Sequence, residues 1–358
     1  MASSPIRVLL TDDSSLARGL LRSFLEADGG FEVVGEAKNG QDAVDMTRAL
    51  RPDLVTMDLE MPVMGGLQAI EEIMCTKAVP ILVVSSVADA QNAYAAVAKG
   101  AVDVVSKPSL DPAEQAEFVA KARMVAKIPV ITHVRALRVP PMATGPLPVA
   151  TTPPPLAAPP LGLETRVFAI ASSTGGPQAL AKLLARIPGD FPCPILVAQH
   201  IADGFAAGMA DWLTSLSPLP VRLAREGMLV EPGQVILAPS EQHLVATSSR
   251  RLTLLERGEH DIYRPSCDAL LTSVANVWGK RSVGIILTGM GSDGAKGMAA
   301  IKAAGGATIA QDEASSVIYG MNRVAVERGA AAHVLGLDDI APAMRDLALG
   351  LDPVRRGA

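Results

Sequence analysis

The chain has 358 residues, more than one compact core accommodates and enough for two domains of about 100–200 residues each. Hydrophobic residues make up 49% of it and aromatic residues only 3%, which is typical of alternating helices and apolar strands rather than an all-β shell. Residues 1–125 carry 11 Lys and Arg against 18 Asp and Glu, and residues 165–358 carry 18 of each. This charge excludes a basic nucleic-acid-binding surface, so we expect no nucleic-acid partner.

The composition also argues against a membrane span, a disulfide framework and a zinc site. No apolar run reaches the roughly 18–20 residues that span a bilayer, and residues 1–5 lead into a strand-like run without a signal-type segment. Cys75, Cys193 and Cys267 lie far apart, without CxxC spacing. We therefore expect a cytoplasmic protein with reduced cysteines and no direct membrane insertion.

The first half alternates apolar strand-like runs with segments of helical spacing. Strands are predicted at 6–11, 31–37, 54–57, 81–86 and 102–106, and helices at 14–27, 41–50, 67–75, 92–99 and 112–126. Fully apolar strands in such an alternation predict a parallel sheet covered by helices on both faces. Ligands of such sheets bind at the carboxyl ends of the strands.

A proline-rich segment separates this half from the rest. Nine of the 27 prolines lie between Val139 and Pro160, where neither a helix nor a sheet interior tolerates them. We predict a first domain at 1–126, an extended linker at 127–164, a second domain at 165–350 and a tail at 351–358.

The second domain repeats the strand–helix alternation, which predicts another doubly wound α/β unit. Within it, Val221–Glu256 has short strands broken by Gly and Pro and is predicted to be an antiparallel insertion or edge.

Polar residues follow the predicted strands of the first domain. Asp12 and Asp13 end the first strand, Asp58 ends the third, and Ser85 and Lys107 end the fourth and fifth. Three converging carboxylates repel one another unless a cation is present, and a hard divalent ion with oxygen ligands relieves this. A lysine and a hydroxyl beside them suit a phosphoryl group on a carboxylate. Any one of these could be a solvated loop residue, but five at four strand ends favour a site.

These residues carry a resemblance. Residues 6–126 resemble the receiver domain of two-component response regulators, in the Asp12-Asp13 pair, in MDLEMPVMGG around Asp58, and in Ser106-Lys107-Pro108. The resemblance implies a flavodoxin-like fold and phosphoryl transfer from a histidine kinase to Asp58, supported by Ser85 and Lys107. It also implies a Mg²⁺ ion held by these groups: Asp12, Asp13, Asp58 and the main chain of Glu60. Val104 stands where many receivers carry an aromatic switch residue, so rotation of an aromatic ring is not expected here.

The second domain opens with a strand, 166–171, that runs into Ser-Ser-Thr-Gly-Gly-Pro at 172–177. A hydroxyl at such a strand–turn–helix lies at a helix N-terminus, where free N–H groups favour developing negative charge. The segment could hold a nucleophile, an N-cap serine or a phosphate-binding turn. The residues alone do not separate Ser172 from Ser173 as the nucleophile.

His200 is the best candidate for a base among the five histidines. It directly follows the strand at 194–199, so it emerges at the same sheet edge as the serine turn. The other four lie in the linker, in the predicted insertion or in a predicted strand: His133, His243, His260 and His333. An acid, Asp293, follows the strand at 283–287 in a glycine-rich loop and could orient His200.

The same loop has a nucleotide-binding interpretation. A P-loop is excluded because Ala295 stands in place of the required lysine. The G-x-G-x-x-G pattern is met by Gly289, Gly291 and Gly294, but no acidic residue ends a strand about 20 residues later. The nucleotide interpretation is therefore the weaker one.

Long segments of the second domain resemble the chemotaxis protein-glutamate methylesterase/protein-glutamine glutaminase (CheB-type) family. They are SSTGGP, QHI, RPSCDALL, ILTGMGSDGAKGM and IAQDEASSVIYGMN. The resemblance implies Ser173 as nucleophile, His200 as base, Asp293 as its orienting carboxylate and the main-chain amide of Met290 as an oxyanion donor, without a cofactor. The family pattern usually reads G-A-S-T-G-G, whereas this chain has Ser172 before Ser173.

The resemblance implies a phosphorylation-activated hydrolase in chemotaxis adaptation. Its substrates would be methyl-accepting chemoreceptors, whose glutamate methyl esters it hydrolyses and whose glutamines it deamidates. The phosphodonor would be a CheA-type histidine kinase. Competing functions are a response regulator with a DNA-binding output, which the neutral second domain disfavours, and a catalytically idle scaffold, which the intact serine, histidine and aspartate disfavour.

Overall fold

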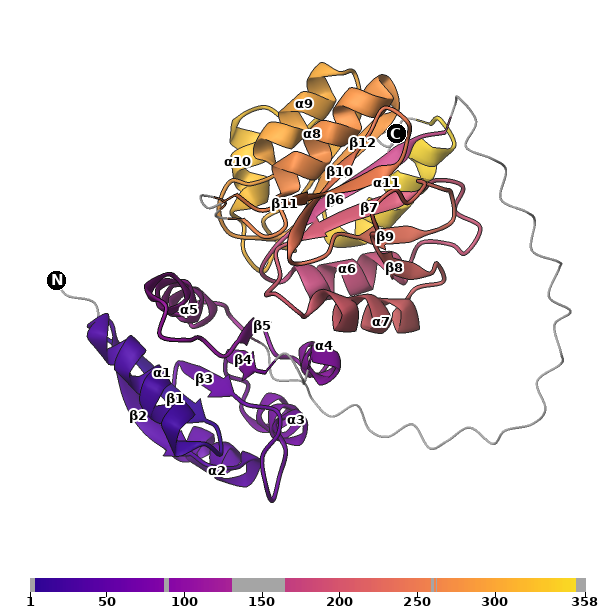
Figure 1. Ribbon diagram of the computed structural model, residues 1–358. Helices are drawn as coiled ribbons and strands as arrows, with labels where there is room; N and C mark the ends of the chain where they lie inside the picture. The colour runs from indigo at the N-terminus through magenta and orange to yellow at the C-terminus, as the bar shows by residue number, and fades with distance from the viewer. Residues whose placement is uncertain (1–3, 87–89, 131–164, 259–260, 262, 352–358) are drawn as a thin grey trace, which may run out of the picture.

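The computed structural model describes residues 4–86, 90–130, 165–258, 261 and 263–351 (Figure 1). The predicted linker, except for 127–130, and the predicted tail, except for Leu351, lie outside these residues. The described residues form a five-stranded sheet and a seven-stranded sheet, each with every strand parallel to its neighbours, and a separate two-stranded pair. Helices cover both faces of each sheet, so the prediction of two doubly wound α/β units is confirmed.

The first sheet has the strand order β2-β1-β3-β4-β5. Its strands are β1 (Ile6–Thr11), β2 (Phe31–Ala37), β3 (Leu54–Met57), β4 (Ile81–Ser85) and β5 (Asp103–Ser106). Its helices are α1 (Ser15–Ala27), α2 (Gly40–Leu50), α3 (Gly66–Thr76), α4 (Ala90–Ala98) and α5 (Pro112–Val125). The strand order reverses between β1 and β3, so the carboxyl ends of these two strands flank the crevice where ligands bind in such sheets.

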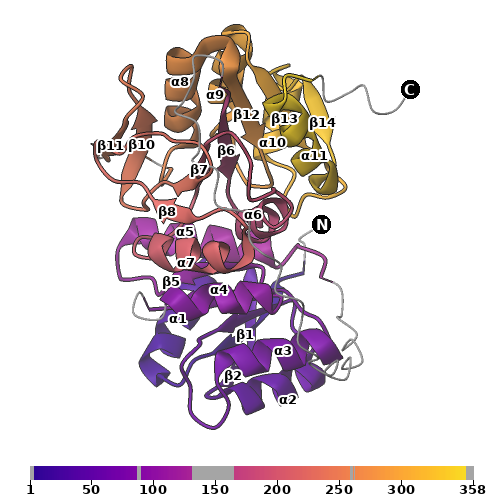
Figure 2. The same ribbon diagram turned by 90° about the vertical axis from the view of Figure 1, so that its right-hand side faces the viewer.

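The second sheet has the order β14-β13-β12-β6-β7-β9-β8 and reverses between β6 and β12. Its strands are β6 (Val167–Ser172), β7 (Ile195–Gln199), β8 (Val221–Leu223), β9 (Val235–Leu237), β12 (Ser282–Ile286), β13 (Ala307–Gln311) and β14 (His333–Leu335). One face is covered by α6 (Gly176–Leu184), α7 (Ala206–Leu216) and α11 (Leu337–Ala348), and the other by α8 (Cys267–Trp278), α9 (Ala295–Ala303) and α10 (Met321–Glu327) (Figures 1 and 2). Each face packs its own layer of aliphatic side chains against the sheet.

The prediction for Val221–Glu256 is half wrong. Strands β8 and β9 are parallel members of the main sheet, and only β10 (Gln242–Ala246) and β11 (Leu252–Glu256) form an antiparallel pair. A strand of three residues is too short for its sequence pattern to indicate whether it runs parallel or antiparallel to its neighbours. Here the parallel pairing of β9 with β7 sets the direction. The strand predicted around His333 is β14, whereas the predictions did not include α10 or α11. A proline inside α11, Pro342, interrupts its helical signal.

The two units pack together mainly through α4 of the first against α6 and α7 of the second (Figure 2). Tyr94 on α4 stacks on Trp212 on α7, with ring centroids 5.7 Å apart. The Gln178 side chain on α6 donates to the carbonyl oxygens of Val97 and Ala101, at 3.2 and 3.1 Å. The aromatic stack and these hydrogen bonds make the interface specific.

The start of α3 allows a clean test of packing. A methyl group on Gly66 would lie 2.1 Å from the carbonyl oxygen of Asp58 and 2.8 Å from Leu59 Cα, which are backbone atoms and cannot move aside cheaply. We expect Gly66→Ala to destabilise the first unit by about 1–3 kcal/mol, measured by urea unfolding.

The matched control is the same substitution inside α1. A methyl group on Gly19 would meet nothing within 4 Å. Gly19→Ala should stabilise the first unit by about 0.5–1 kcal/mol because alanine has the higher helix propensity. Effects of the same sign at both positions would contradict this account.

Candidate functional site

The acidic residues of the first unit converge at the β1–β3 crevice. One carboxylate oxygen each from Asp12, Asp13 and Asp58 lies within 4.8 Å of the other two. Lys107 Nζ lies 2.8 Å from Asp12 Oδ2 and 3.1 Å from Asp58 Oδ2. The Lys107 amide donates to the main-chain oxygen of Ser85, so the ends of β4 and β5 reach the same edge. The structure thus brings together the five polar strand-end residues that the sequence singled out.

The electrostatics of this crevice favour bound cations. Burial raises the pKa of Asp58, and the neighbouring Asp12 raises it further, against the opposing effect of Lys107. Burial works to lower the pKa of Lys107, but the two carboxylates outweigh it and raise that pKa above its usual value. Asp12 Oδ2 is buried, and its charged neighbour is the Lys107 ammonium at 2.8 Å. Closely spaced carboxylate oxygens of this kind are suitable ligands for a hard divalent ion.

In the second unit, Gln199 organises the ends of β6 and β7. Its Oε1 accepts a hydrogen bond from Ser172 Oγ at 2.7 Å, and its Nε2 donates to the main-chain oxygens of Ser173 and His200 at 2.8 and 2.7 Å. Ser172 and Gln199 are both buried. The sequence reading missed Gln199; its one signal was its place directly before His200 at a strand end.

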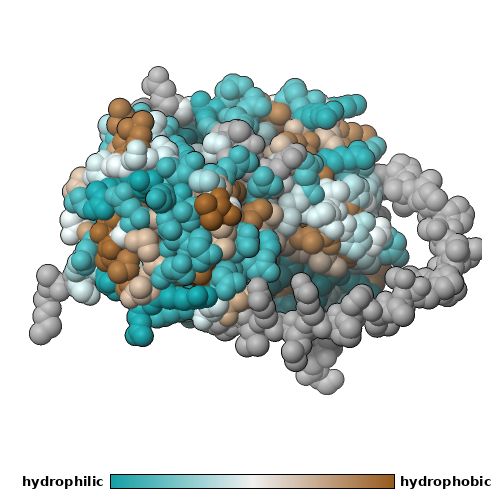
Figure 3. Space-filling view, turned by 90° about the horizontal axis from the view of Figure 1, so that it is seen from below, coloured by the Kyte–Doolittle hydropathy of each residue, from teal (hydrophilic) through white to brown (hydrophobic). Residues whose placement is uncertain are grey.

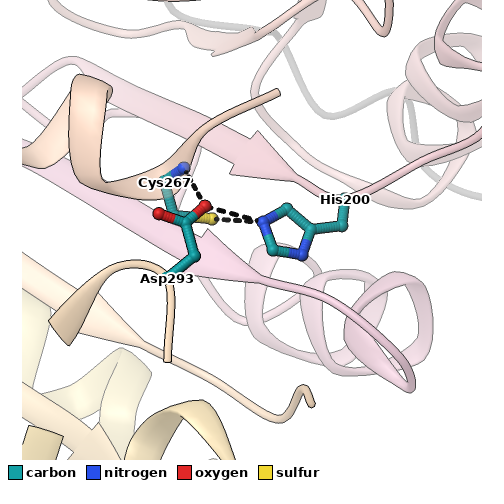
Figure 4. A group of neighbouring side chains, drawn as sticks. All are labelled: His200, Cys267 and Asp293. Atoms are coloured by element: carbon teal, nitrogen blue, oxygen red, sulfur yellow. Dashed lines mark hydrogen bonds and ion pairs between the residues drawn. The ribbon is translucent and has the colours of Figure 1, made fainter. Parts of the chain in front are cut away.

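Asp293 lies beside His200 and against the first turn of α8 (Figure 4). His200 Nε2 is 2.8 Å from Asp293 Oδ2, which also accepts the Cys267 amide at 2.6 Å, while Oδ1 accepts the Asp268 amide at 2.9 Å. Burial works to raise the pKa of Asp293, but the hydrogen bonds from His200 and the helix amides outweigh it and lower the pKa. The carboxylate is therefore held ionised and fixed in orientation.

Ser173 lies at the same edge, packed against the loop that carries Asp293. It is 6% exposed, and a methyl group on Gly289 would come within 2.6 Å of Ser173 Cβ, so only glycine fits there. His200 Nδ1 is the ring nitrogen that faces away from Asp293, and it makes no hydrogen bond to the part of the chain that the structure describes (Figure 4). Among the described residues no hydrogen bond joins Ser173 Oγ to the His200 ring.

Tyr263 is a second residue that the sequence reading missed. Its ring stacks on His200 with centroids 5.1 Å apart and planes 14° from parallel. Its hydroxyl lies over Gly291, 3.0 Å from where a Cβ would be. Tyr263 thus restricts rotation of the imidazole and touches the glycine-rich loop; nothing in the sequence around it signals this.

The other described histidines have different surroundings. His243 Nε2 is 2.8 Å from Asp261 Oδ2, and its Nδ1 accepts the amide of Ser266, the N-cap of α8. His243 therefore supports the start of α8. His333 lies half-buried in β14, and His133 and His260 lie outside the described residues.

Comparison with known proteins decides the family. The sequence model of the family described as CheB methylesterase matches residues 168–344, and that of the response regulator receiver domain matches residues 8–119. Protein-glutamate methylesterase/protein-glutamine glutaminase 3 of Paramagnetospirillum magneticum is 60% identical over 97% of both chains. This chain belongs to the CheB family. Protein-glutamate methylesterase/protein-glutamine glutaminase 2 of Anaeromyxobacter dehalogenans is 44% identical over 96% of this chain and 97% of its own.

A solved structure agrees with the CheB assignment. The crystal structure of the Thermotoga maritima CheB methylesterase catalytic domain is similar with a TM-score of 0.50 and 36% identity, over 51% of this chain and 98% of that one. Within the described residues, no helix is both long enough and apolar enough to cross a bilayer. Figure 3 shows one face of the molecule, on which hydrophobic residues are interspersed among hydrophilic ones.

The raised pKa of Asp58 predicts a pH-dependent effect of Asp58→Asn. A carboxyl whose pKa is higher in the folded than in the unfolded chain costs stability when ionised, and this cost vanishes below the unfolded pKa of about 3.9. Without divalent cations, Asp58→Asn should raise the free energy of unfolding at pH 7, and the gain should disappear as the pH falls to about 3.

Urea unfolding in EDTA across this pH range measures the gain. The exposed Asp45→Asn is the control and should stay within about 0.5 kcal/mol of the parent throughout. A destabilised Asp58→Asn variant at pH 7 would contradict the electrostatic account of the crevice.

Proposed function

We propose that this chain is a phosphorylation-controlled hydrolase of chemotaxis adaptation. It removes methyl groups from glutamate methyl esters on chemoreceptors, releasing methanol, and deamidates glutamines at such sites. The observation that carries the proposal is the His200–Asp293 pair, held at 2.8 Å on the sheet edge where the Ser173 turn emerges. The printed names of the 60% and 44% identical relatives support the same activity.

The chemistry follows from which ring nitrogen Asp293 engages. Asp293 keeps the His200 proton on Nε2, so Nδ1 is the nitrogen that takes the proton as Ser173 Oγ attacks the ester carbonyl. His200 then gives this proton to the departing methoxide, and methanol leaves an acyl-enzyme. A water molecule, activated by the same nitrogen, hydrolyses the acyl-enzyme. Deamidation runs through the same steps with ammonia as the leaving group.

Two serines compete for the role of nucleophile, and their surroundings favour Ser173. The Ser172 hydroxyl is fully buried and donates to Gln199 Oε1, a buried bond whose loss would leave an unpaired amide oxygen. Among the described residues, Ser173 Oγ makes no such bond. In resting enzymes the bond between nucleophile and base is often long and tightens only with substrate bound.

The oxyanion that forms at the ester carbonyl needs hydrogen-bond donors in place. The Gly289 amide donates to the Ile318 carbonyl oxygen at 3.0 Å and is therefore occupied. The next amide, that of Met290, donates to no atom of the described residues, and its side chain is 51% exposed at the rim. We assign the Met290 amide as an oxyanion donor, a role worth about 3–4 kcal/mol in comparable enzymes.

Ser173→Ala should lower methanol release from methylated receptor membranes by at least about 10⁴-fold, because nucleophilic attack is lost. Ser172→Ala is the matched control and should keep most of the activity while lowering stability by about 1–3 kcal/mol through the unpaired Gln199. Loss of activity in Ser172→Ala with retention in Ser173→Ala would overturn the assignment.

The first unit supplies the control input. We assign Asp58 as the residue that a histidine kinase phosphorylates, with Lys107 and Ser85 binding the phosphoryl oxygens. The Mg²⁺ that such receivers use would be held by these groups: Asp12, Asp13, Asp58 and the main-chain oxygen of Glu60. The ion would supply charge neutralisation at the phosphoryl oxygens.

The receiver covers the catalytic edge in this structure. Lys121 on α5 bonds to Asp103 of its own unit at 2.8 Å and to Thr174 Oγ1, beside the proposed nucleophile, at 2.9 Å. Ile318, whose carbonyl oxygen holds the Gly289 amide, packs against the hydrophobic cluster of the receiver. This docking supports an autoinhibited state that phosphorylation of Asp58 weakens.

Lys121→Ala should raise the methanol-release rate of the unphosphorylated protein several-fold, because it removes a bond between the receiver and the catalytic edge. Arg48→Ala is the matched control, since Arg48 pairs with Glu72 on the receiver surface at 3.1 Å and should leave the rate unchanged. A smaller difference between phosphorylated and unphosphorylated rates in Lys121→Ala is also expected. An unchanged basal rate would count against autoinhibition through this contact.

A further inference from the structure

Cys267 places its thiol in the same cluster as His200 and Asp293 (Figure 4). Its Sγ lies 3.5 Å from His200 Nε2, and one ligand atom of each of the three residues lies within 4.8 Å of the others. Cys267 and Asp293 are buried, whereas the His200 side chain is 14% exposed and forms the open side of the cluster. A thiolate, an imidazole and a carboxylate are the ligand types that bind zinc.

We propose that Zn²⁺, or a divalent ion of similar softness, binds His200 Nε2, Cys267 Sγ and Asp293 Oδ2 and switches the hydrolase off. Zinc holds such ligands at about 2.0–2.3 Å in a tetrahedron, which separates them from one another by about 3.3–3.6 Å. The sulfur-to-nitrogen distance already fits. The nitrogen-to-oxygen distance of 2.8 Å must open by about half an ångström.

The charge of the filled site suits its burial. Cys267 loses its thiol proton to solvent when the metal–sulfur bond forms, so the ion, the thiolate and the Asp293 carboxylate sum to zero. A neutral complex avoids the large penalty of an unpaired charge in the interior. The partly exposed imidazole leaves the fourth position of the tetrahedron to water.

Inhibition follows from the tautomer of His200. A metal ion on Nε2 displaces the hydrogen from that nitrogen, so the neutral ring carries its proton on Nδ1. A protonated Nδ1 cannot accept the proton of Ser173. This consequence rests on the proposed function, whereas metal binding itself does not.

Cobalt titration of the full chain tests the site, with millimolar Mg²⁺ present to occupy the oxygen ligands of the receiver. We expect one equivalent of Co²⁺ to give a thiolate-to-cobalt charge-transfer band that Zn²⁺ displaces. Cys267→Ala should lose the band and bind more than about tenfold more weakly. The matched control, Cys75→Ala/Cys193→Ala, keeps only the Cys267 thiol and should retain the band. Cys267→Ser gives the same test with side-chain volume preserved.

Methanol release at buffered free Zn²⁺ tests the switch, each variant compared with its own rate in EDTA. The full chain and the Cys75→Ala/Cys193→Ala variant should lose at least tenfold in rate. Cys267→Ala should need more than tenfold higher Zn²⁺ for the same loss. Absence of the band in the full chain, or its persistence in Cys267→Ala and Cys267→Ser, overturns the metal site. A band with unchanged methanol release supports the site and overturns the role of His200 as base.

Discussion

The parallel pairing of β6 with β7 on one side and β12 on the other is the constraint on which the catalytic unit depends. Parallel strands present their carboxyl ends at one edge, and β6 lies where the strand order reverses. The turn after β6 carries Ser173, β7 is followed by His200, and the loop after β12 carries Asp293. Residues separated by up to 120 positions in the chain therefore meet without any long excursion of the backbone.

Two further elements turn this edge into a site of fixed geometry. Helix α8 directs its first amides at Asp293, which holds the carboxylate ionised despite its burial. Gln199 joins the ends of β6 and β7, and its bond to Ser172 leaves the proposed nucleophile as the neighbouring serine. The same compactness brings the buried Cys267 thiol to the imidazole. The site therefore has fixed side-chain positions for catalysis, and its His200, Cys267 and Asp293 side chains also lie close to the arrangement in which proteins bind zinc.

The proposed coupling between the units has a simple physical basis. The receiver contacts the catalytic unit through α4 and α5, with the Tyr94–Trp212 stack at one place and the Lys121–Thr174 bond at another. Lys107 pairs with Asp58, the proposed phosphorylation site, and follows β5, and α4 and α5 flank that strand in the chain. Small changes at the crevice thus have a short path to the covered edge.

Local patterns in the sequence were enough for the architecture and for most of the candidate site. Apolar strands alternating with helical spacing predicted two parallel sheets, and the strand-end positions of Asp58 and His200 predicted where ligands meet. The direction of the short strands β8 and β9 was not predicted correctly, because three residues are too few to show a periodic pattern. The helix α11 was missed because Pro342 interrupts its pattern.

The amino-acid sequence alone was therefore enough to predict which residues reach each sheet edge, because strand periodicity and strand ends are local properties. Only the tertiary structure decided which hydroxyl is tied to Gln199, which ring nitrogen of His200 faces Asp293, and that Tyr263 and Cys267 touch the same imidazole. These are contacts between segments far apart in the chain. Their geometry depends on strand register and helix packing, which no spacing of residues encodes.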